Sequence, residues 1–276
     1  MFIQTDTVLH STILDAVPGV SHAFSTRHGG VSTLPHTASL NLTRNLGDDD
    51  AVVEKNLDIF SRIVSQNRHD RTRAVTTHQI HSAKVRVIDK TNAGEGCSRE
   101  SGEDCDGFVT DTPGVIPIIR AADCVPILLA GLKRDGSPVV SAVHAGWRGT
   151  VNGIAAEAVR ILCEQGAEIG TIRAAIGPHI GQCCFEVGED FVTAVSDIRG
   201  SDFAHRHTIP SPHGKPGKYH ADLTGMNLEI LENAGLSRDS IDVSDACTMC
   251  DTALFYSHRG MNGLRGTMGG GICITI

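Results

Sequence analysis

The sequence has few aromatic side chains and no run of basic residues. Aromatic residues make up only 4% of the 276 residues, with a single tryptophan, and the formal net charge is -8. Nucleic-acid binding relies on basic patches that contact phosphates and on aromatic side chains that stack on bases. We therefore expect no nucleic-acid partner.

Long apolar runs are also lacking. The longest, such as VPILLAG at 125–131, are far shorter than the roughly 20 residues that span a bilayer. The first residues, MFIQTDTVLHSTILDAVPG, show no basic start and no long apolar core of the kind that a secretory signal needs. We therefore expect a cytoplasmic protein with no membrane partner. No linker or repeat divides the chain, which predicts a single domain over residues 1–276.

Nine cysteines are an odd number at irregular spacing, which argues against a disulfide scaffold and for reduced thiols. Cys183 and Cys184 are adjacent, and we interpret them as packing residues. Cys247 and Cys250 form a CxxC pair. Such a pair could bind a metal or form a redox pair. Because a second CxxC is absent from the sequence, the pattern does not support a four-cysteine zinc site, and we favour structural thiols.

Apolar periodicity predicts mixed elements without regular βαβ alternation, which favours an α+β fold with mixed sheets. Asp48 to Asp50 could cap the first long helix, and residues 200–220, rich in proline, glycine and histidine, are predicted to form a loop. Strand patterns cover 74–89, 107–111, 115–131 with a break near Ala121, 137–145 and 171–177, and helix patterns cover 48–66, 149–167, 187–197 and 221–235.

Two of these strands are joined by the turn signal LKRDG and predict an antiparallel hairpin. If the turn is centred near Arg134, Cys124 pairs directly with His144. Directly paired residues share a face, with Cβ atoms roughly 4.5–5.5 Å apart. A thiol and an imidazole could then bind one metal ion, although a slip of one residue in the register would separate them.

The segment HQIH offers a third metal ligand. If it is a strand, His78 and His81 face opposite ways, and the spacing leaves open which of them points to the site. Two histidines and one cysteine with a vacant fourth position are typical of a catalytic zinc, which can lower the pKa of bound water to about 7. Cys124 and His144 could alternatively act without metal, as the nucleophile and base of a cysteine hydrolase.

Several longer phrases together resemble the YfiH/YlmD laccase-domain family, which includes bacterial proteins named polyphenol oxidases and purine nucleoside phosphorylases. The resemblance runs from about residue 20 to the C-terminus. It implies a single-domain α/β/β/α sandwich with mixed sheets and a zinc ion held by His81, Cys124 and His144, with copper less favoured. The phrases are STRHGGVS, SLNL, HQIHS, DGFVTD, RAADCVPILL, AVHAGWRGT, AAIGPHIGQCCFEVGEDF and CTMC…FYSHR.

The resemblance implies phosphorolysis of adenosine, inosine, guanosine and methylthioadenosine to the free base and ribose 1-phosphate, together with adenosine deamination. A nucleoside and phosphate are the implied partners, and a homodimer is plausible for the family. A zinc amidase that removes L-serine from UDP-MurNAc-L-serine is the alternative. Copper-dependent phenol oxidation is disfavoured, because the chain has only one His-x-His pair, at His205 and His207.

Candidate functional residues follow from these readings. Asp106 is a candidate catalytic acid beside the three ligands, and Asp123 is a second candidate. Trp147 could stack on a base or cover the end of the hairpin. An arginine fork suits phosphate oxygens, and the glycines beside Arg27 and Arg148 would allow close approach of the backbone. The expected substrate-binding residues are Arg27, Asn41 and Arg148, whereas Arg259 and Arg265 lie in a divergent C-terminal motif and have no assigned role.

Overall fold

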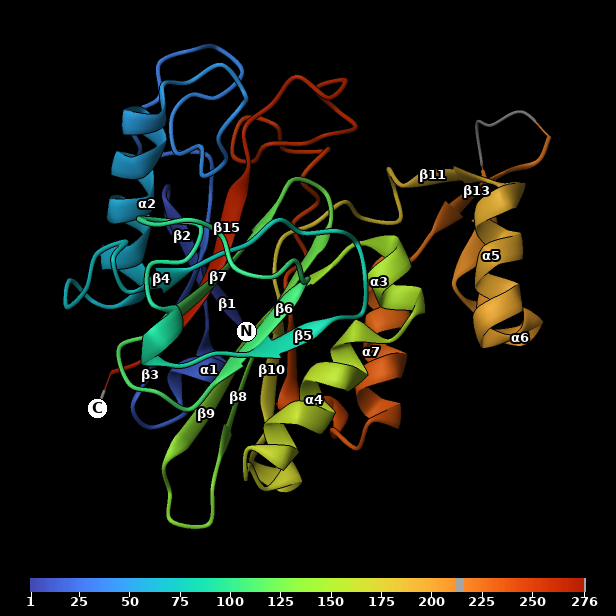
Figure 1. Ribbon diagram of the computed structural model, residues 1–276. Helices are drawn as coiled ribbons and strands as arrows, with labels where there is room; N and C mark the ends of the chain where they lie inside the picture. The colour runs from blue at the N-terminus through green and yellow to red at the C-terminus, as the bar shows by residue number, and fades with distance from the viewer. Residues whose placement is uncertain (212–215, 276) are drawn as a thin grey trace.

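The computed structural model describes residues 1–211 and 216–275 and contains two six-stranded sheets that pack face to face (Figure 1). In spatial order, the first sheet contains β1 (Phe2–Gln4), β2 (Val8–Ser11), β3 (Val20–Ser25), β15 (Met268–Ile274), β7 (Ile116–Ala121) and β4 (Ala74–Val75). The second contains β14 (Ile241–Val243), β10 (Arg173–Ile176), β8 (Val125–Leu132), β9 (Pro138–Ala145), β6 (Gly107–Thr110) and β5 (Val85–Val87). Both sheets mix parallel and antiparallel pairs.

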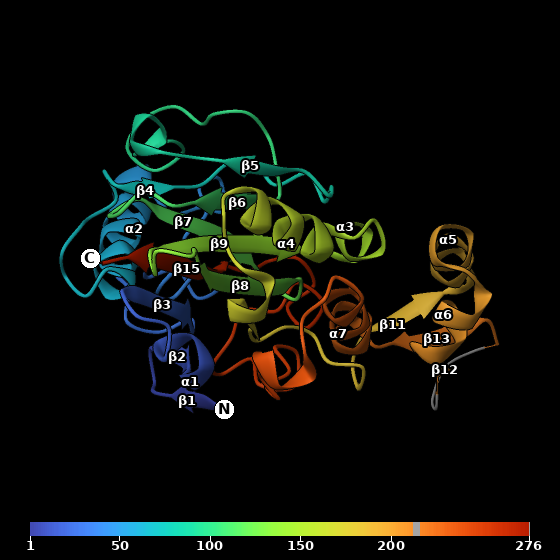
Figure 2. The same cartoon turned by 90° about the horizontal axis from the view of Figure 1, so that it is seen from below.

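Helices cover the outer faces of the two sheets (Figure 2). α2 (Asp50–Val64) packs on the first sheet, and α4 (Ile154–Glu164) and α7 (Leu223–Asn233) pack on the second. A separate apolar cluster fills the space between the sheets. These layers confirm the predicted α/β/β/α sandwich with mixed sheets. The remaining helices are α1 (Thr12–Asp15), α3 (Trp147–Val151), α5 (Glu189–Arg199) and α6 (Ser201–Arg206), with 3-10 turns at Lys90–Asn92, Ile169–Thr171 and Arg238–Ser240.

Burial on both faces explains why β8 is almost continuously apolar. Ile127 and Leu129 belong to the core beneath α4 and α7, whereas Leu128 and Ala130 belong to the core between the sheets. Successive side chains of a strand point to opposite faces, so a strand covered on both sides needs apolar residues at every position.

The hairpin of β8 and β9 is confirmed as antiparallel, but the predicted register is wrong by two residues. His144 pairs with Pro126, and Cys124 lies just before β8 begins. Because side chains alternate with a period of two, a shift of two residues keeps the same face toward the site.

The helix predicted over 149–167 is wrong as a single element. α3 already begins at Trp147, and the chain breaks between α3 and α4, where Gly153 has a φ of 84°. The acidic residues predicted at the start of α2 do lie there, with Asp49 at the N-cap and Asp50 in the first turn, but the Asp49 side chain makes no capping hydrogen bond. The Asp48 carboxylate instead accepts hydrogen bonds from Ser32, Thr37 and Asn41.

A small lobe stands to one side of the sandwich (Figures 1 and 2). Its sheet has the order β11-β13-β12, formed by β11 (Glu186–Gly188), β13 (Lys218–Ala221) and β12 (Thr208–Pro210), and it carries α5 and α6. The loop predicted over 200–220 is therefore wrong for most of its described residues, because α6 forms at Ser201–Arg206 and β13 pairs with both β11 and β12. Residues 212–215 of that prediction lie outside the described residues.

No helix among the described residues is both long enough and apolar enough to cross a membrane.

We predict that Phe60→Ala lowers the free energy of unfolding by about 3–5 kcal/mol, the usual cost of removing a buried aromatic ring. The Phe60 side chain is fully buried and packs over Gly269 and Gly271 of β15. Urea denaturation measures the change. Ile198→Ala is the control, because Ile198 is 52% exposed, and it should change the free energy by less than about 0.5 kcal/mol. Equal losses in the two variants would contradict this account of the core.

Candidate functional site

Three side chains that could hold a metal ion converge at one end of the sandwich. Cys124 Sγ lies 3.7 Å from His81 Nε2, and the donor atoms of His81, Cys124 and His144 all lie within 4.8 Å of one another. The two imidazole rings meet edge to face, with centroids 4.9 Å apart. The structure thus brings together the three predicted ligands. His78 is not part of this group, because its side chain is 74% exposed and faces Asp104.

The segment that carries His81 is a loop, so the strand predicted over 74–89 is wrong between its ends. β4 ends at Val75 and β5 begins at Val85. Between them the backbone N–H groups of Ile80, His81 and Ser82 all donate to the carboxylate of Asp106, at 2.7–3.2 Å. These N–H groups would otherwise pair with a neighbouring strand. His81 has a φ of 59°, which lets the loop curl around the carboxylate.

Asp106 also fixes the orientation of His144. Its Oδ1 lies 2.9 Å from His144 Nδ1, and its Oδ2 accepts a further hydrogen bond from the Ser82 hydroxyl. A carboxylate that accepts from one imidazole nitrogen directs the other nitrogen toward a metal. The Asp106 side chain is fully buried. The structure therefore makes Asp106 a residue that positions His144 and the His81 loop. The role of Asp106 as a catalytic acid stays a prediction.

Two glycines of the HAGWRG segment make room for the His81 loop. A Cβ atom on Gly146 would lie 2.5 Å from His81 Cδ2, and one on Gly149 would lie 2.7 Å from the Ser82 carbonyl oxygen. Contacts this short with backbone or a packed ring require the loop to move. The sequence had suggested that the glycines beside Arg148 let a ligand approach the backbone. The structure shows instead that they admit another loop of the protein.

Charge is concentrated on the half-buried Cys124 and the buried His144. Burial alone would raise the pKa of the Cys124 thiol, but His144 and His81 outweigh it and lower that pKa to about 6. Burial would lower the pKa of His144, but the adjacent Cys124 thiolate and Asp106 raise it to about 9. The pKa of Asp106 is lowered to about 2, because hydrogen bonds from His144 and Ser82 outweigh the effect of burial. The thiol therefore ionises readily, as a metal ligand must.

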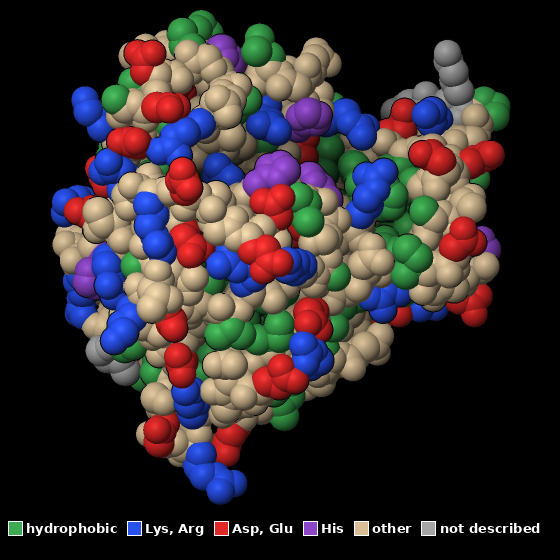
Figure 3. All heavy atoms as spheres, in the orientation of Figure 1, with side chains coloured by type: hydrophobic (Ala, Val, Ile, Leu, Met, Phe, Trp, Pro, Cys, Tyr) green, Lys and Arg blue, Asp and Glu red, His purple; other side chains and the backbone are tan. Residues whose placement is uncertain are grey.

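A cavity of about 290 Å³ opens beside the three side chains. The surface view shows a group of histidines next to a recess between the main body and the small lobe (Figure 3). Six separate stretches of the chain contribute to its walls. The lining residues are His81, Ala122, Asp123, Cys124, Trp147, Ile180, Phe185, Leu223, His258, Arg259 and Arg265.

One wall of the cavity is apolar and partly aromatic. Trp147 packs against Phe191 of the small lobe, with ring centroids 5.1 Å apart. The Trp147 ring therefore lines the cavity and also connects α3 to α5. The sequence had suggested that it stacks on a base or covers the end of the hairpin. Arg148 stacks on the same ring, with its guanidinium carbon 4.2 Å from the centroid, and does not line the cavity.

The cations at the cavity are Arg259 and Arg265, which the sequence left without a role. Arg259 Nη1 donates to the Glu186 carbonyl, and its backbone N–H donates to Asp123. Arg265 Nε is buried and has no hydrogen-bond partner among the described residues. An arginine at the mouth of a cavity with a free N–H suits an anionic group. No charge pattern in the sequence distinguishes these two arginines from the others. Their position in the C-terminal segment that carries the CTMC…FYSHR phrase is the one signal that could have identified them.

Arg27 and Asn41, two of the predicted substrate-binding residues, lie outside the lining of this cavity. The Arg27 guanidinium donates to the backbone carbonyls of Ala38, Thr252 and Pro35. The amide of Asn41 bonds to Thr43, Asp48 and Thr267. Both side chains hold loops together, and neither lines the cavity.

Asp123, the second candidate acid, does line the cavity. It has a φ of 83°, which turns the chain between β7 and β8. Its carboxylate accepts hydrogen bonds of 2.6 Å from the Thr248 hydroxyl and the Arg259 N–H. The His-x-His pair lies apart from the site, because His207 in the small lobe bonds to Glu229.

The fold and the site define an α/β/β/α protein with a candidate His–Cys–His metal centre on the wall of a cavity. The model of the family described as multi-copper polyphenol oxidoreductase laccase matches residues 21–275, and the chain belongs to this family, the YfiH/YlmD family. The chain is 35% identical over 246 residues to adenosine deaminase RL5 from an unknown prokaryotic organism. The alignment covers 88% of this chain and 90% of that protein. It is 34% identical over 253 residues to the purine nucleoside phosphorylase YlmD of Geobacillus stearothermophilus, covering 91% and 88% of the two chains.

Solved structures agree with the family assignment. The crystal structure of the Bacillus licheniformis hypothetical protein YfiH superposes with a TM-score of 0.87 at 29% identity, covering 99% of this chain and 98% of that one. The YlmD structure from Geobacillus stearothermophilus superposes with a TM-score of 0.83 at 31% identity, covering 100% and 99% of the chains. The relatives named as purine nucleoside enzymes identify the chain as a member of a family of enzymes.

We predict that Asp106→Asn lowers metal affinity about ten- to a hundred-fold, as loss of a carboxylate behind a ligating histidine usually does. The amide keeps the shape of the carboxylate but cannot accept all of its hydrogen bonds. Competition with a chromophoric chelator measures the affinity. Asp104→Asn, at the exposed carboxylate beside His78, is the control and should leave it unchanged. Equal affinities in the two variants would show that Asp106 does not position the ligands.

We predict that Gly146→Ala displaces the His81 ring and lowers zinc occupancy, because its methyl group would overlap that ring. Metal analysis of the purified variant by mass spectrometry measures the occupancy. Gly170→Ala is the matched control, since a Cβ at Gly170 meets nothing within 4 Å. Full occupancy in Gly146→Ala would mean that the loop can shift without loss of the site.

Proposed function

We propose that this protein is a zinc-dependent purine nucleoside enzyme. It would phosphorolyse adenosine, inosine, guanosine and methylthioadenosine to the free base and ribose 1-phosphate, and it would also deaminate adenosine. The observation that carries the proposal is the cluster of His81, Cys124 and His144, of which His81 and Cys124 line a cavity with an aromatic wall and two arginines. The relatives named as a purine nucleoside phosphorylase and an adenosine deaminase support it.

The side chains present fit a zinc ion. Two imidazoles and a thiol of lowered pKa are ligands that zinc prefers, and a buried carboxylate supports one of the imidazoles. Three protein ligands beside a cavity are typical of a catalytic rather than a structural zinc. A zinc ion held there supplies a Lewis acid that activates water or polarises a substrate group.

The cavity walls offer one surface for the purine base and another for phosphate. Trp147, Phe185 and Leu223 offer an apolar surface for the flat face of a purine. Arg259 and Arg265 replace Arg27 and Arg148 as the residues that we propose bind phosphate. Arg265 is the stronger candidate, because its buried Nε lacks a partner among the described residues and an anion would satisfy it.

Deamination also needs a group that moves a proton at the purine. Asp106 does not line the cavity, and its carboxylate is held by His144 and by the N–H groups of the His81 loop. We propose Asp123, which lines the cavity next to Cys124. Its two hydrogen bonds, from Thr248 and Arg259, hold the carboxylate in place.

One observation favours a second candidate, the metal-free cysteine hydrolase. The lowered pKa of Cys124 and the raised pKa of His144 describe a thiolate–imidazolium pair, which is also the resting state of a cysteine nucleophile. The proximity of His81, a second imidazole for which that mechanism has no need, favours the metal reading.

The test is to incubate metal-analysed protein with adenosine, with and without phosphate, and to identify the products by mass. Adenine and ribose 1-phosphate that form only with phosphate, and are lost in Cys124→Ala, support phosphorolysis. Inosine that forms regardless of phosphate supports deamination. No turnover at full zinc occupancy would overturn both activities, and UDP-MurNAc-L-serine is then the next substrate. Turnover that persists after zinc is removed would favour the cysteine hydrolase.

We predict that Arg265→Gln raises the KM for phosphate about ten- to a hundred-fold, because a charge-assisted hydrogen bond contributes about 1.5–3 kcal/mol. Deamination of adenosine should persist in the same variant, since that reaction uses no phosphate. Phosphate titrations at saturating adenosine provide the measurement. Arg134→Gln is the control, because the Arg134 side chain is 95% exposed in the hairpin turn. An unchanged KM in Arg265→Gln would remove Arg265 from the phosphate site.

A further inference from the structure

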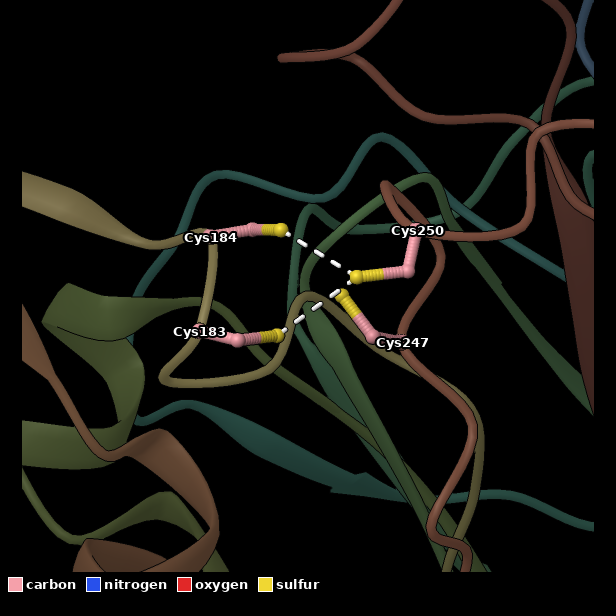
Figure 4. Close-up of side chains that lie close together, drawn as sticks. All are labelled: Cys183, Cys184, Cys247 and Cys250. Atoms are coloured by element: carbon pink, nitrogen blue, oxygen red, sulfur yellow. Dashed lines mark hydrogen bonds between the residues drawn. The ribbon is translucent and has the colours of Figure 1, made fainter.

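A second group of metal-binding side chains lies outside the site described above. Cys183, Cys184, Cys247 and Cys250 come together although two of them lie more than sixty residues from the other two (Figure 4). Their four sulfur atoms all lie within 4.8 Å of one another. Cys250 Sγ is 3.4 Å from Cys184 Sγ and 3.6 Å from Cys183 Sγ.

We infer that these four cysteines bind one zinc ion as a structural Zn(Cys)4 site. The distances support this geometry, because a tetrahedral zinc with Zn–S bonds of about 2.3 Å places its sulfur ligands about 3.8 Å apart. The observed separations lie around that value. Each thiol that becomes a ligand gives up its proton to solvent, so binding needs no oxidant or other reactant.

The backbone around the cluster suits a thiolate centre. The Gly181 N–H donates to Cys247 Sγ at 3.2 Å. Burial raises the pKa of Cys247, but backbone N–H groups of Gly181, Cys250 and Met249 help to lower it below its usual range. A side chain at 181 would crowd the sulfurs, since a Cβ there would lie 3.2 Å from Cys183 Sγ and 3.5 Å from Cys247 Sγ.

A bound cation would favour the ionised form of all four thiols. Burial and neighbouring thiols raise the pKa of Cys183 to about 11 and raise that of Cys184 further. Sulfurs this close repel one another when charged, and a zinc ion removes the repulsion by binding all four. The interpretation of Cys183 and Cys184 as packing residues, and of the CxxC pair as unsupported for zinc, does not fit this arrangement. The sequence alone does not show that the adjacent pair Cys183–Cys184 and the single CxxC pair lie together in the fold.

The cluster joins two walls of the cavity. Ile180 and Phe185, which line it, flank Cys183 and Cys184 in the chain. On the other side, Thr248 follows Cys247 and donates to Asp123. A bridge between His179 and Cys247 and the bond from Thr248 N–H to the His179 carbonyl join the same segments. A zinc ion would thus fasten residues 180–186 to residues 247–259 and fix the width of the cavity.

The test counts zinc in the full-length protein by native mass spectrometry after reconstitution under reducing conditions. We expect about two zinc ions per chain in the wild type, about one in Cys124→Ser, about one in Cys250→Ser and none in the double variant. Cys183 and Cys250 are exposed, so serine at either position should leave the fold intact. Cys163→Ser, at a half-buried cysteine outside both groups, is the matched control and should retain both ions.

Separate variants distinguish this inference from the proposed function, on which it does not rest. A folded Cys124→Ser protein that takes up no zinc would overturn the four-cysteine site, whatever its effect on nucleoside turnover. A Cys250→Ser protein with unchanged zinc content would do the same. A chain that binds no zinc, and whose mass is lower by the hydrogen atoms that thiols lose when they form disulfides, would show that the cluster forms disulfides instead. In Cys124→Ser loaded with Co2+, a strong thiolate charge-transfer band is expected, and its absence would also contradict the site.

Discussion

The buried carboxylate of Asp106 is the constraint on which the site depends. It accepts hydrogen bonds from the N–H groups of residues 80–82, from the Ser82 hydroxyl and from His144 Nδ1. A buried charge is costly unless it is paired and hydrogen-bonded. Satisfying this one therefore requires the His81 loop and the end of β9 to lie side by side. The same contacts that stabilise Asp106 place two imidazoles next to Cys124.

Two strands of the sandwich hold Cys124 and His144, whereas segments far apart in the sequence line the cavity beside them. β8 and β9 are buried on both faces and carry Cys124 and His144 at their adjoining ends. The small lobe and the C-terminal segment then close over these strand ends, through Trp147 against Phe191 and Arg259 against Asp123. Two of the three metal donors thus lie at the ends of strongly packed strands, whereas His81 and most of the groups that would contact substrate lie on connecting segments.

The sequence predicted what depends on local pattern. The hairpin, the break before Cys124 and helix α2 follow from turn chemistry and apolar periodicity, and an error of two residues in register left the site face unchanged. His81 was separated from His78 only by the family resemblance. What the sequence did not predict depends on contacts between distant segments. Arg27 and Arg148 look as suitable for phosphate as Arg259 and Arg265, and only the path of the C-terminal segment brings the latter pair to the cavity.

The glycines of HAGWRG show why a short phrase can identify this fold. Neither Gly146 nor Gly149 binds anything, yet any side chain at these positions would collide with the loop that crosses them. Their identity is set by the path of the backbone and is independent of the reaction. A descendant that replaced Cys124 and lost its metal would still need both glycines for as long as the loop stayed in place. The phrase is thus a signature of architecture, and reading activity from it requires the sulfur and the two imidazoles as well.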